Sequence, residues 1–528
     1  MRIGRILRST PIVTLTALLS ACSAPVPHRG EEIGLVVLIS VDQLPAYLFS
    51  RYDTLYQHGL RRLLQQGGIY TDATHDHALT WTSAGHATLV TGVVPARHGI
   101  VANGWLEVVD GEGRHVESVD DDGEQIVGVR GKVGMSPRNL LVSSLPDWIV
   151  ATDPESRVVS ISGKRTAAVL MGGKTEAGYV YYFEDDVGRF VTSTYYRAGY
   201  PDWAQRFNDE VLADFYSDSV WECQVPSAAR KLAREDDADY ENGGKNFNFP
   251  HAFSAEVTDD GDPETFYDWW DHTPALDQAT LELARAAVAA LSLGRRGHLD
   301  YLAVSLSQLD RVGHYYGPLS LEQLDAILAL DQALGGFLDY LDAEVGAGRY
   351  ILAFTSDHGV VELPGYRRAQ GSSGREVTAS EQRRAYREAL EAAGTASDEG
   401  REAAIGALER LDFVADVMTI DELTDPTSPD SFIALYQRSY SPGRVAGALA
   451  REGLVLRLAE GMHGGPEPTT HGSPYLYDRN VPLIFFGSGI ERGTVGAPAR
   501  SVDVAPTLAE LAGIPYPADL DGRALIRQ

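Results

Sequence analysis

The sequence is poor in cysteine and in basic side chains. It contains only Cys22 and Cys223, too few for a disulfide framework, so the fold cannot depend on a network of disulfides. Lysine and arginine number 45 against 74 aspartate and glutamate residues, which gives a formal net charge of −29. Such an acidic surface argues against nucleic acid or an anionic membrane as the main partner. An anionic substrate would therefore need a strong local cation.

The sequence shows no internal repeat. Its 528 residues are 44% hydrophobic and 23% charged, which is enough for a large core and is unlike a disordered or fibrous chain.

The N-terminus has the pattern of an export signal. Residues 1–21 combine a basic start, a short apolar middle and a small-residue end, which distinguishes a signal peptide from a membrane span. The ending Leu-Ser-Ala-Cys looks like a bacterial lipobox, in which Cys22 would be lipidated and become the mature N-terminus. The alternative is a plain signal peptide with an incidental cysteine.

If Cys22 carries lipid, Cys223 has no partner for an intrachain disulfide. Residues 22–32 are polar and would form a tether that holds the folded part away from the membrane. Ser23 after the lipidated position resembles the sorting pattern for the outer membrane. We therefore expect an exported protein, lipid-anchored at the periplasmic face of the bacterial outer membrane.

Buried strands followed by acidic residues dominate the rest of the chain. The continuous apolar, β-branched run 35–41 is typical of a buried parallel strand, and Asp42 follows it directly. Similar runs at 299–305 and 350–355 precede Asp310 and Asp357. The alternation of strands with helical patterns predicts an α/β fold with a doubly wound, mostly parallel sheet flanked by helices. Sites in such sheets form at the C-terminal ends of the strands.

We expect one discontinuous catalytic domain with two insertions. The domain comprises residues 33–166, 298–363 and 466–528, and the insertions are a cap at 167–297 and a second segment at 364–465. Tyr267, Trp269 and Trp270 are interpreted as the core of the cap, in preference to a substrate platform. Further patterns predict helices at 55–66, 140–150, 321–345 and 504–512, and a hairpin at 179–194.

The stretch 80–92 predicts a short loop that opens a helix, with Thr82 at the N-cap. A threonine there commonly does no more than cap the helix. The same position also attracts an anion such as phosphate, because of the free N–H groups and the helix dipole. Asn103 lies in a glycine-punctuated loop and is either a turn residue or a group presented over the site. Lys164 and Arg165 follow a predicted strand and are either solvated or directed at a phosphate.

Six histidine and aspartate residues form a candidate metal constellation. They are Asp42, Asp310, His314, Asp357, His358 and His471. Imidazole with carboxylate suits Zn²⁺, whereas an all-oxygen set would suit Mg²⁺ or Ca²⁺. Six ligands divide into two three-ligand sites with open positions, and two ions stabilise both the attacking and the leaving oxygen of a phosphoryl displacement. An ion that also contacts Thr82 would lower the pKa of its hydroxyl and produce a nucleophile.

Several short motifs resemble the alkaline phosphatase superfamily, and within it the phosphate-irrepressible alkaline phosphatases and the related nucleotide pyrophosphatase/phosphodiesterases. The motifs are Asp42 after Leu-Ile-Ser-Val, residues 82–86, 95–100 and 440–444, Asp310 with His314, Asp357-His358-Gly359, residues 470–473 and the ending 502–508. The resemblance covers nearly the whole mature chain.

The resemblance implies two zinc ions, one held by Asp310, His314 and His471 and the other by Asp42, Asp357 and His358. It also implies that Thr82 is the nucleophile and that Asn103 hydrogen-bonds a phosphoryl oxygen. Lys164 matches a lysine that marks the monoesterases. The family pattern continues Lys-x-Arg, whereas this chain has Arg165 and then Thr166, so either the turn is shifted or the second cation is missing.

The leading hypothesis is a lipoprotein phosphomonoesterase that acts on small phosphate esters as a monomer, through a phospho-threonine intermediate. The nearest alternative is a phosphodiesterase with the same ions and nucleophile. An alternative of another class is a catalytically silent lipoprotein that binds metal or phosphate esters.

Overall fold

The computed structural model describes residues 32–109, 112–217, 219–255, 266–393, 398–425 and 431–525. The predicted signal peptide, the lipidation site Cys22 and the tether up to residue 31 lie outside the described residues. Among the residues that are described, we find no helix with the length and apolar character needed to cross a membrane.

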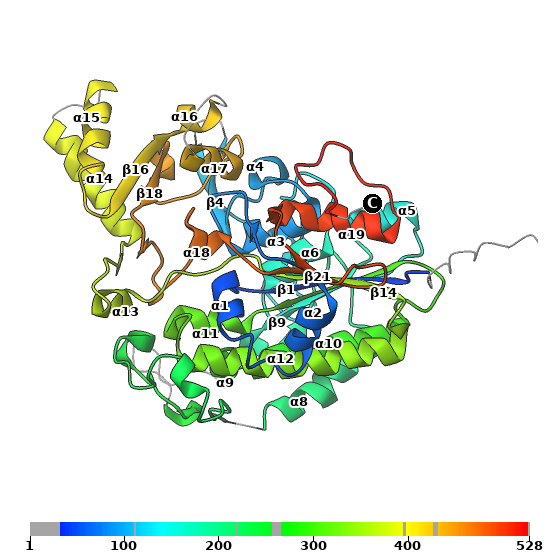
Figure 1. The fold of residues 1–528 in the computed structure, drawn as a ribbon. Helices are drawn as coiled ribbons and strands as arrows, with labels where there is room; N and C mark the ends of the chain where they lie inside the picture. The colour runs from blue at the N-terminus through cyan, green and yellow to red at the C-terminus, as the bar shows by residue number, and fades with distance from the viewer. Residues whose placement is uncertain are drawn as a thin grey trace, which may run out of the picture.

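A nine-stranded sheet organises the fold (Figure 1), in the order β10-β9-β8-β13-β1-β14-β20-β2-β21. The strands from β9 to β14 in this order are parallel, while β10 and β20 pair antiparallel with their neighbours β9 and β14. The strands are β1 (Leu35–Val41), β2 (Gly68–Tyr70), β8 (Val158–Ser162), β9 (Tyr179–Glu184), β10 (Arg189–Val191), β13 (Asp300–Leu306), β14 (Tyr350–Thr355), β20 (Leu483–Gly487) and β21 (Gly493–Val495). The prediction of a mostly parallel sheet is confirmed.

Helices cover both faces of this sheet (Figure 1), so every residue of β1, β13 and β14 is buried. Side chains alternate across a strand, and Val37 accordingly packs in the core on one face while Val36 packs in the core on the other. The first face carries α2 (Gly59–Gln66), α10 (Ala275–Leu291), α11 (Gln308–Tyr316) and α12 (Leu321–Leu341), and the second carries α3 (Thr82–Thr91), α5 (Leu145–Thr152), α6 (Arg165–Gly172) and α19 (Val504–Ala512). This is the predicted doubly wound arrangement.

Some predicted helices are displaced at their ends. The helix predicted over 55–66 begins only at Gly59. The helix predicted over 140–150 starts later, because Ser144 and Asp147 form a capping box at the start of α5. The long helix predicted over 321–345 ends at Leu341 and continues as one π-helical turn to Gly346.

The cap begins later than predicted. Residue 167, the predicted boundary, lies inside α6, and the hairpin that follows it adds to the main sheet because β9 pairs parallel with β8. Helix α10, also assigned to the cap, covers a face of the sheet. The cap is therefore the segment between β10 and α10. It includes α7 (Asp202–Arg206), α8 (Leu212–Phe215), β11 (Val220–Trp221), β12 (His251–Ala252) and α9 (Phe266–Asp271). Trp269 and Trp270 are buried in the core that it shares with the sheet.

The second insertion forms a lobe with a small core of its own (Figure 1, yellow to orange). Its elements are α13 (Pro364–Ala369), β15 (Arg375–Glu376), α14 (Ala379–Ala393), α15 (Asp398–Leu408), β16 (Val414–Thr419), α16 (Ile420–Thr424), α17 (Ser431–Ser439), β17 (Arg444–Val445), β18 (Leu454–Leu458) and β19 (Met462–His463). Strand β17 leaves the lobe and pairs with β4 (Gly104–Val109), which pairs in turn with β5 (Glu112–Glu117).

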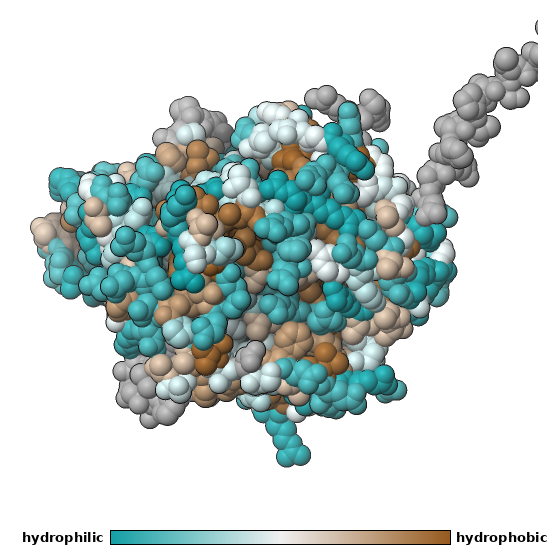
Figure 2. Space-filling view, turned by 60° about the horizontal axis from the view of Figure 1, so that its bottom comes forward, coloured by the Kyte–Doolittle hydropathy of each residue, from teal (hydrophilic) through white to brown (hydrophobic). Residues whose placement is uncertain are grey.

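Hydrophilic residues cover most of the face shown in Figure 2, and apolar residues gather in small patches near its centre and toward its upper and lower edges. This agrees with the acidic, polar composition of the chain.

Candidate active site and metal centre

Three neighbouring strands bring the candidate ligands to one edge of the sheet. Strands β13, β1 and β14 lie side by side in that order. Asp42 directly follows β1, Asp357 comes two residues after β14, and Asp310 lies in the first turn of α11, just after β13. Since parallel strands end at the same edge of a sheet, the three buried carboxylates meet there.

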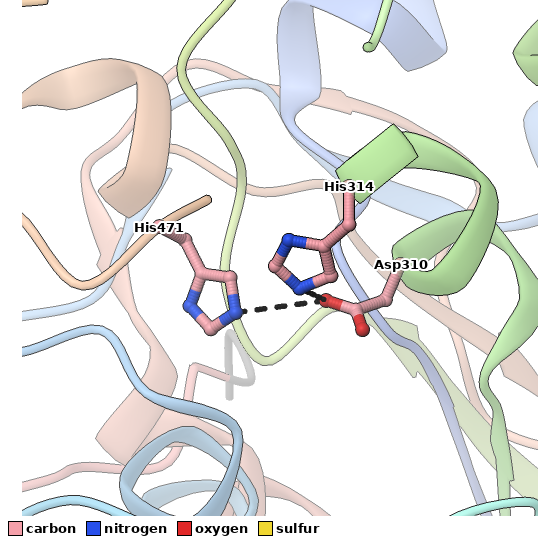
Figure 3. Close-up of side chains that lie close together, drawn as sticks. All are labelled: Asp310, His314 and His471. Carbon is pink, nitrogen blue, oxygen red and sulfur yellow. Dashed lines mark ion pairs between the residues drawn. The ribbon is translucent and has the colours of Figure 1, made fainter. Parts of the chain in front are cut away.

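The first group contains Asp310, His314 and His471 (Figure 3). His314 follows Asp310 by one helical turn, and its Nε2 lies 3.2 Å from Oδ1 of Asp310. Nε2 of His471 lies 3.6 Å from the same oxygen. Nδ1 of His314 donates to the Thr469 carbonyl at 2.7 Å, and Nδ1 of His471 donates to the Thr80 carbonyl at 2.7 Å. These bonds fix each ring so that Nε2 faces the carboxylate.

The second group contains Asp42, Asp357 and His358. Nε2 of His358 lies 3.2 Å from Oδ1 of Asp42 and 3.2 Å from Oδ2 of Asp357, while its Nδ1 donates to the Gly359 carbonyl at 3.0 Å. Burial alone would lower the pKa of His358, but the Asp357 and Asp42 carboxylates raise it to about 9. The two groups adjoin, because the rings of His358 and His471 stack with their centroids 3.5 Å apart.

Both groups fit divalent metal ions. The ligand atoms of each group lie within 4.8 Å of one another. Oδ1 of Asp42 and Oδ2 of Asp357 are buried and accept no hydrogen bond from the described part of the chain, and each has Nε2 of His358 at 3.2 Å. Buried carboxylate oxygens of this kind are costly unless a cation meets them. Imidazole and carboxylate ligands, with the outer ring nitrogens held by carbonyls, form a donor set that zinc accepts.

The structure thus brings the six predicted ligands together in the two predicted groups. Metal binding by these residues stays a prediction.

Thr82 lies beside the second group. It is the first residue of α3 and follows the N-cap Trp81, so its prediction as the N-cap is wrong by one position. Its Oγ1 lies 3.3 Å from Nε2 of His358. Gly85 permits this close approach, because a Cβ atom there would clash with the carbonyl oxygen of Asp357. The N-terminus of α3, the positive end of the helix dipole, therefore lies beside the second group.

Asn103 is held by the start of the same helix. Its Oδ1 accepts a hydrogen bond from the backbone N–H of Ser83 at 2.9 Å. Its carbonyl oxygen accepts another from Ser118 at 2.8 Å. With Oδ1 engaged, the amide nitrogen of Asn103 is the side-chain donor that a bound ligand would meet.

Lys164 links the two groups. It is the N-cap residue of α6, its Nζ lies 2.7 Å from Oδ2 of Asp42, and it forms a second ion pair with Oδ2 of Asp310. Burial opposes its charge, but the Asp310 and Asp42 carboxylates raise the pKa of Lys164, so it stays protonated. The predicted cation is therefore at the site.

Arg165 does not join the other predicted residues. It is the first residue of α6, about half of its side chain is exposed, and its Nε lies 3.8 Å from Oδ1 of Asp120. The predicted phosphate contact is thus wrong for this geometry, because the helix starts at Arg165 and turns its side chain toward Asp120. The turn before α6 is therefore not shifted in a way that would bring Arg165 to the place of the arginine missing at position 166.

Gln43 and His86 have roles that the sequence pattern did not reveal. Gln43 has a left-handed backbone, with φ of 60°, and its Nε2 donates to Oδ1 of Asp310 at 2.8 Å. Nδ1 of His86 lies 2.9 Å from the Thr82 carbonyl and 3.2 Å from Oδ2 of Asp357. The spacing of His86, one helical turn after Thr82, is a signal that could have identified it.

A cavity of about 390 Å³ opens beside the site, toward the second insertion. Its lining includes Asn103, Trp81 and His471 from the site, and Tyr436 and Met462 from the second insertion. The site therefore has room for a group larger than phosphate.

Known proteins are similar to this chain in sequence and in fold. A family profile described as type I phosphodiesterase / nucleotide pyrophosphatase matches residues 36–448. The chain is 32% identical to a Myroides odoratus protein named calcium-transporting ATPase, over 93% of each chain. It is 31% identical to alkaline phosphatase PhoV of Synechococcus elongatus, over 94% of this chain and 93% of PhoV. Alkaline phosphatase PafA of Elizabethkingia meningoseptica is another relative. A crystal structure of alkaline phosphatase PafA matches this chain with a TM-score of 0.82 and 28% identity, over 94% of this chain and 98% of that one.

The sheet, with its paired histidine and aspartate groups at the strand ends, defines an enzyme of the alkaline phosphatase superfamily. Within that superfamily, the chain belongs to the type I phosphodiesterase / nucleotide pyrophosphatase family.

Proposed function

We propose that the protein is a two-zinc alkaline phosphatase that hydrolyses small organic phosphate monoesters through a phospho-threonine intermediate. The Thr82 hydroxyl carries this proposal, because it lies 3.3 Å from Nε2 of His358 at the N-terminus of α3. A hydroxyl beside a cation site can act as a nucleophile, and the helix terminus favours the phosphate that it would attack. Similarity to the alkaline phosphatases PhoV and PafA supports the same reaction.

Each metal group would hold one zinc ion, the first through Asp310, His314 and His471 and the second through Asp42, Asp357 and His358. When bound, zinc supplies Lewis-acid chemistry that lowers the pKa of a nearby hydroxyl and offsets charge on the phosphoryl oxygens.

Thr82 carries the covalent step. Its Oγ attacks phosphorus after losing its proton to solvent, and the bond from phosphorus to the ester oxygen breaks. The alcohol leaves with a proton from water. A water molecule then attacks the phospho-threonine, the bond from phosphorus to Oγ breaks, and inorganic phosphate leaves while Thr82 regains its proton.

Asn103 and Lys164 position the phosphoryl group. The amide nitrogen of Asn103 donates to one phosphoryl oxygen, since its Oδ1 is already held by Ser83. Lys164 offers its charge to another oxygen from its place between Asp42 and Asp310. The cavity toward the second insertion receives the leaving group.

Phosphodiester hydrolysis is the second candidate function. The family profile carries the phosphodiesterase name, and Thr166 stands where the family pattern has a second cation. A diester has one less charge on its free oxygens and so depends less on such a cation.

The Thr82→Ala variant tests the proposal. We expect it to lose phosphoryl transfer and keep its metal content, and acid-quenched wild-type enzyme should carry phosphate on Thr82. Thr82→Ser is the matched control, because it keeps a hydroxyl. If the alanine variant retained most of its activity, the phospho-threonine route would be wrong.

The proposal includes lipid anchoring through Cys22 and action as a monomer. The lipobox-like residues 19–22 support the anchor, and one chain supplies every candidate site residue. Cys22→Ser should give a soluble or unprocessed form. If mass spectrometry found that the mature chain starts at a residue other than Cys22 and carries no lipid, the lipid anchor would be contradicted.

A further inference from the structure

Arg311 is an arginine beside the site with no part in the reaction described above. It directly follows Asp310 in α11, and about a quarter of its side chain is exposed. The phosphate monoester of the proposed reaction carries two charges, whereas Lys164 already faces two carboxylates and Arg165 turns to Asp120. A further cation would therefore have a clear electrostatic use here.

The packing of α11 directs Arg311 toward Lys164. Ser307 caps this helix, and its Oγ lies 3.2 Å from Oγ of Ser162, which also accepts a hydrogen bond from the Lys164 backbone at 3.0 Å. A Cβ atom at Gly163 would press on Ser307. Arg311 follows Ser307 by four residues, and its N–H donates to the Ser307 carbonyl at 3.3 Å. Residues four apart share a helix face, so Arg311 lies on the face that packs against the turn carrying Lys164.

The cap holds Arg311 in place. Its Nη1 forms an ion pair of 2.7 Å with Oδ2 of Asp271, at the end of α9. Asp271 is buried, and its carbonyl oxygen accepts a hydrogen bond from the Gln308 side chain. Nε of Arg311 is buried and donates to no partner among the described residues. The guanidinium is thus oriented through Nη1, while about a quarter of the side chain stays exposed.

The charges of this pair and of Lys164 act on one another. Burial raises the pKa of Asp271 to about 7, and the Arg311 and Lys164 cations oppose this rise. The contact of Ser307 with Ser162 places the Arg311 face of α11 beside the turn that carries Lys164.

We infer that Arg311, oriented by Asp271, is a second substrate-binding cation beside Lys164 and contacts an unsubstituted phosphoryl oxygen. It thereby favours dianionic monoesters over monoanionic diesters. This inference rests on the proposed function and gives the site an arginine from α11, where α6 has Thr166.

The test compares Arg311→Gln and Arg311→Lys with the wild type. Charge-assisted contacts are worth about 1.5–3 kcal/mol. Arg311→Gln should therefore lower kcat/KM for a monoester by roughly ten- to a hundred-fold, with a much smaller loss for a diester. It should weaken binding of inorganic phosphate by a similar factor, and the lysine variant should recover part of both losses.

Arg62→Ala is the matched control. Arg62 has a similarly shielded side chain, and it pairs with Asp342 at 2.5 Å. Asp342 accepts a hydrogen bond from Tyr350 at the start of β14, which is the end of that strand away from the site. We expect this variant to keep the activity and the phosphate affinity of the wild type.

Two results would overturn the inference. One is folded, metal-loaded Arg311→Gln protein with unchanged phosphate affinity. The other is an equal loss of monoester and diester activity. Wild-type protein without monoesterase activity would instead contradict the proposed function, and equilibrium phosphate binding would still decide the role of Arg311.

Discussion

Gln43 donates a hydrogen bond of 2.8 Å from Nε2 to Oδ1 of Asp310, although the two residues are 267 positions apart in the chain. The backbone N–H of Gln43 also lies 3.3 Å from Oδ1 of Asp357. One residue with a left-handed backbone therefore holds a carboxylate of each metal group. Backbone strain of this kind persists where the surroundings enforce it.

Gln43→Gly should weaken metal binding and not destabilise the backbone. Glycine adopts positive φ without strain, whereas loss of the Nε2 donor leaves Asp310 less well oriented. Loss of such a supporting bond typically costs about 10- to 100-fold in metal affinity, measurable by chelator competition. Unchanged metal affinity would show that Gln43 does not position Asp310.

Lys164→Ala should reduce monoester hydrolysis more than diester hydrolysis. A monoester presents one more charged oxygen, and a charge-assisted contact is worth about 1.5–3 kcal/mol. We therefore expect roughly a ten- to hundred-fold lower kcat/KM for a monoester. Metal content must be measured alongside, since Lys164 pairs with Asp42 and Asp310. Equal losses for both substrates would favour the phosphodiesterase alternative.

Adding an arginine at position 166 should increase the monoester preference. Thr166 follows Arg165 in the first turn of α6, beside Lys164. Thr166→Arg would place another cation near the phosphate, so the ratio of monoester to diester kcat/KM should rise. Thr166→Gln, of similar length without the charge, is the control. A rise in both variants would indicate a packing effect.

Chelation should remove activity, and Zn²⁺ should restore it. Each of the two groups offers three ligands, so the active enzyme should contain two zinc ions per chain by elemental analysis. His471→Ala should empty the first site only. Active enzyme with one ion or none would contradict the two-zinc proposal.

Glu322→Gln should stabilise the protein increasingly as pH rises. Burial raises the pKa of Glu322 from 4.5 to about 8; Asp236 and Asp325 add to this rise, and Arg234 opposes it. Nε2 of His251 lies 3.0 Å from its Oε1. The folded protein then keeps a proton that the unfolded chain releases above 4.5, so this group makes folding less favourable as pH climbs toward about 8.

Unfolding temperatures measured across that pH range provide the check. The difference in unfolding temperature between Glu322→Gln and the wild type should be small near pH 4.5 and should increase toward about pH 8. A gap that stays constant, or narrows, would show that Glu322 is ionised throughout in the folded state.

The sequence predicts those parts of the site that depend on local pattern. Asp42 and Asp357 follow apolar strands, and such strands end together at one edge of a parallel sheet. The helix predicted over 504–512 is correct, since α19 has these bounds. Both signals for this helix, the apolar spacing and the glycine that ends it, are visible in the sequence. The predicted place of Thr82 is correct to within one position, which is the usual uncertainty of a helix end.

The remaining features depend on contacts between distant segments. Gln43 acquires its role from a left-handed φ and from Asp310, neither of which leaves a local pattern. Arg165 turns to Asp120 because α6 starts one residue after Lys164. The hairpin at 179–194 is recognisable from its alternation, but its parallel pairing with β8 is not, so the predicted start of the cap is too early.

Strand β17 limits how far this enzyme could be shortened. It pairs with β4 immediately after Asn103, and Nη1 of Arg444 donates to the carbonyl oxygens of Gly99 at 2.7 Å and Asn139 at 2.8 Å. Deleting residues 364–465 as one block would leave β4 with an unpaired edge. It would also remove the hydrogen bonds by which Arg444 holds the loop that carries Asn103. Protein engineers who wish to trim the lobe should therefore retain the short stretch around Arg444, either in place or grafted onto the loop.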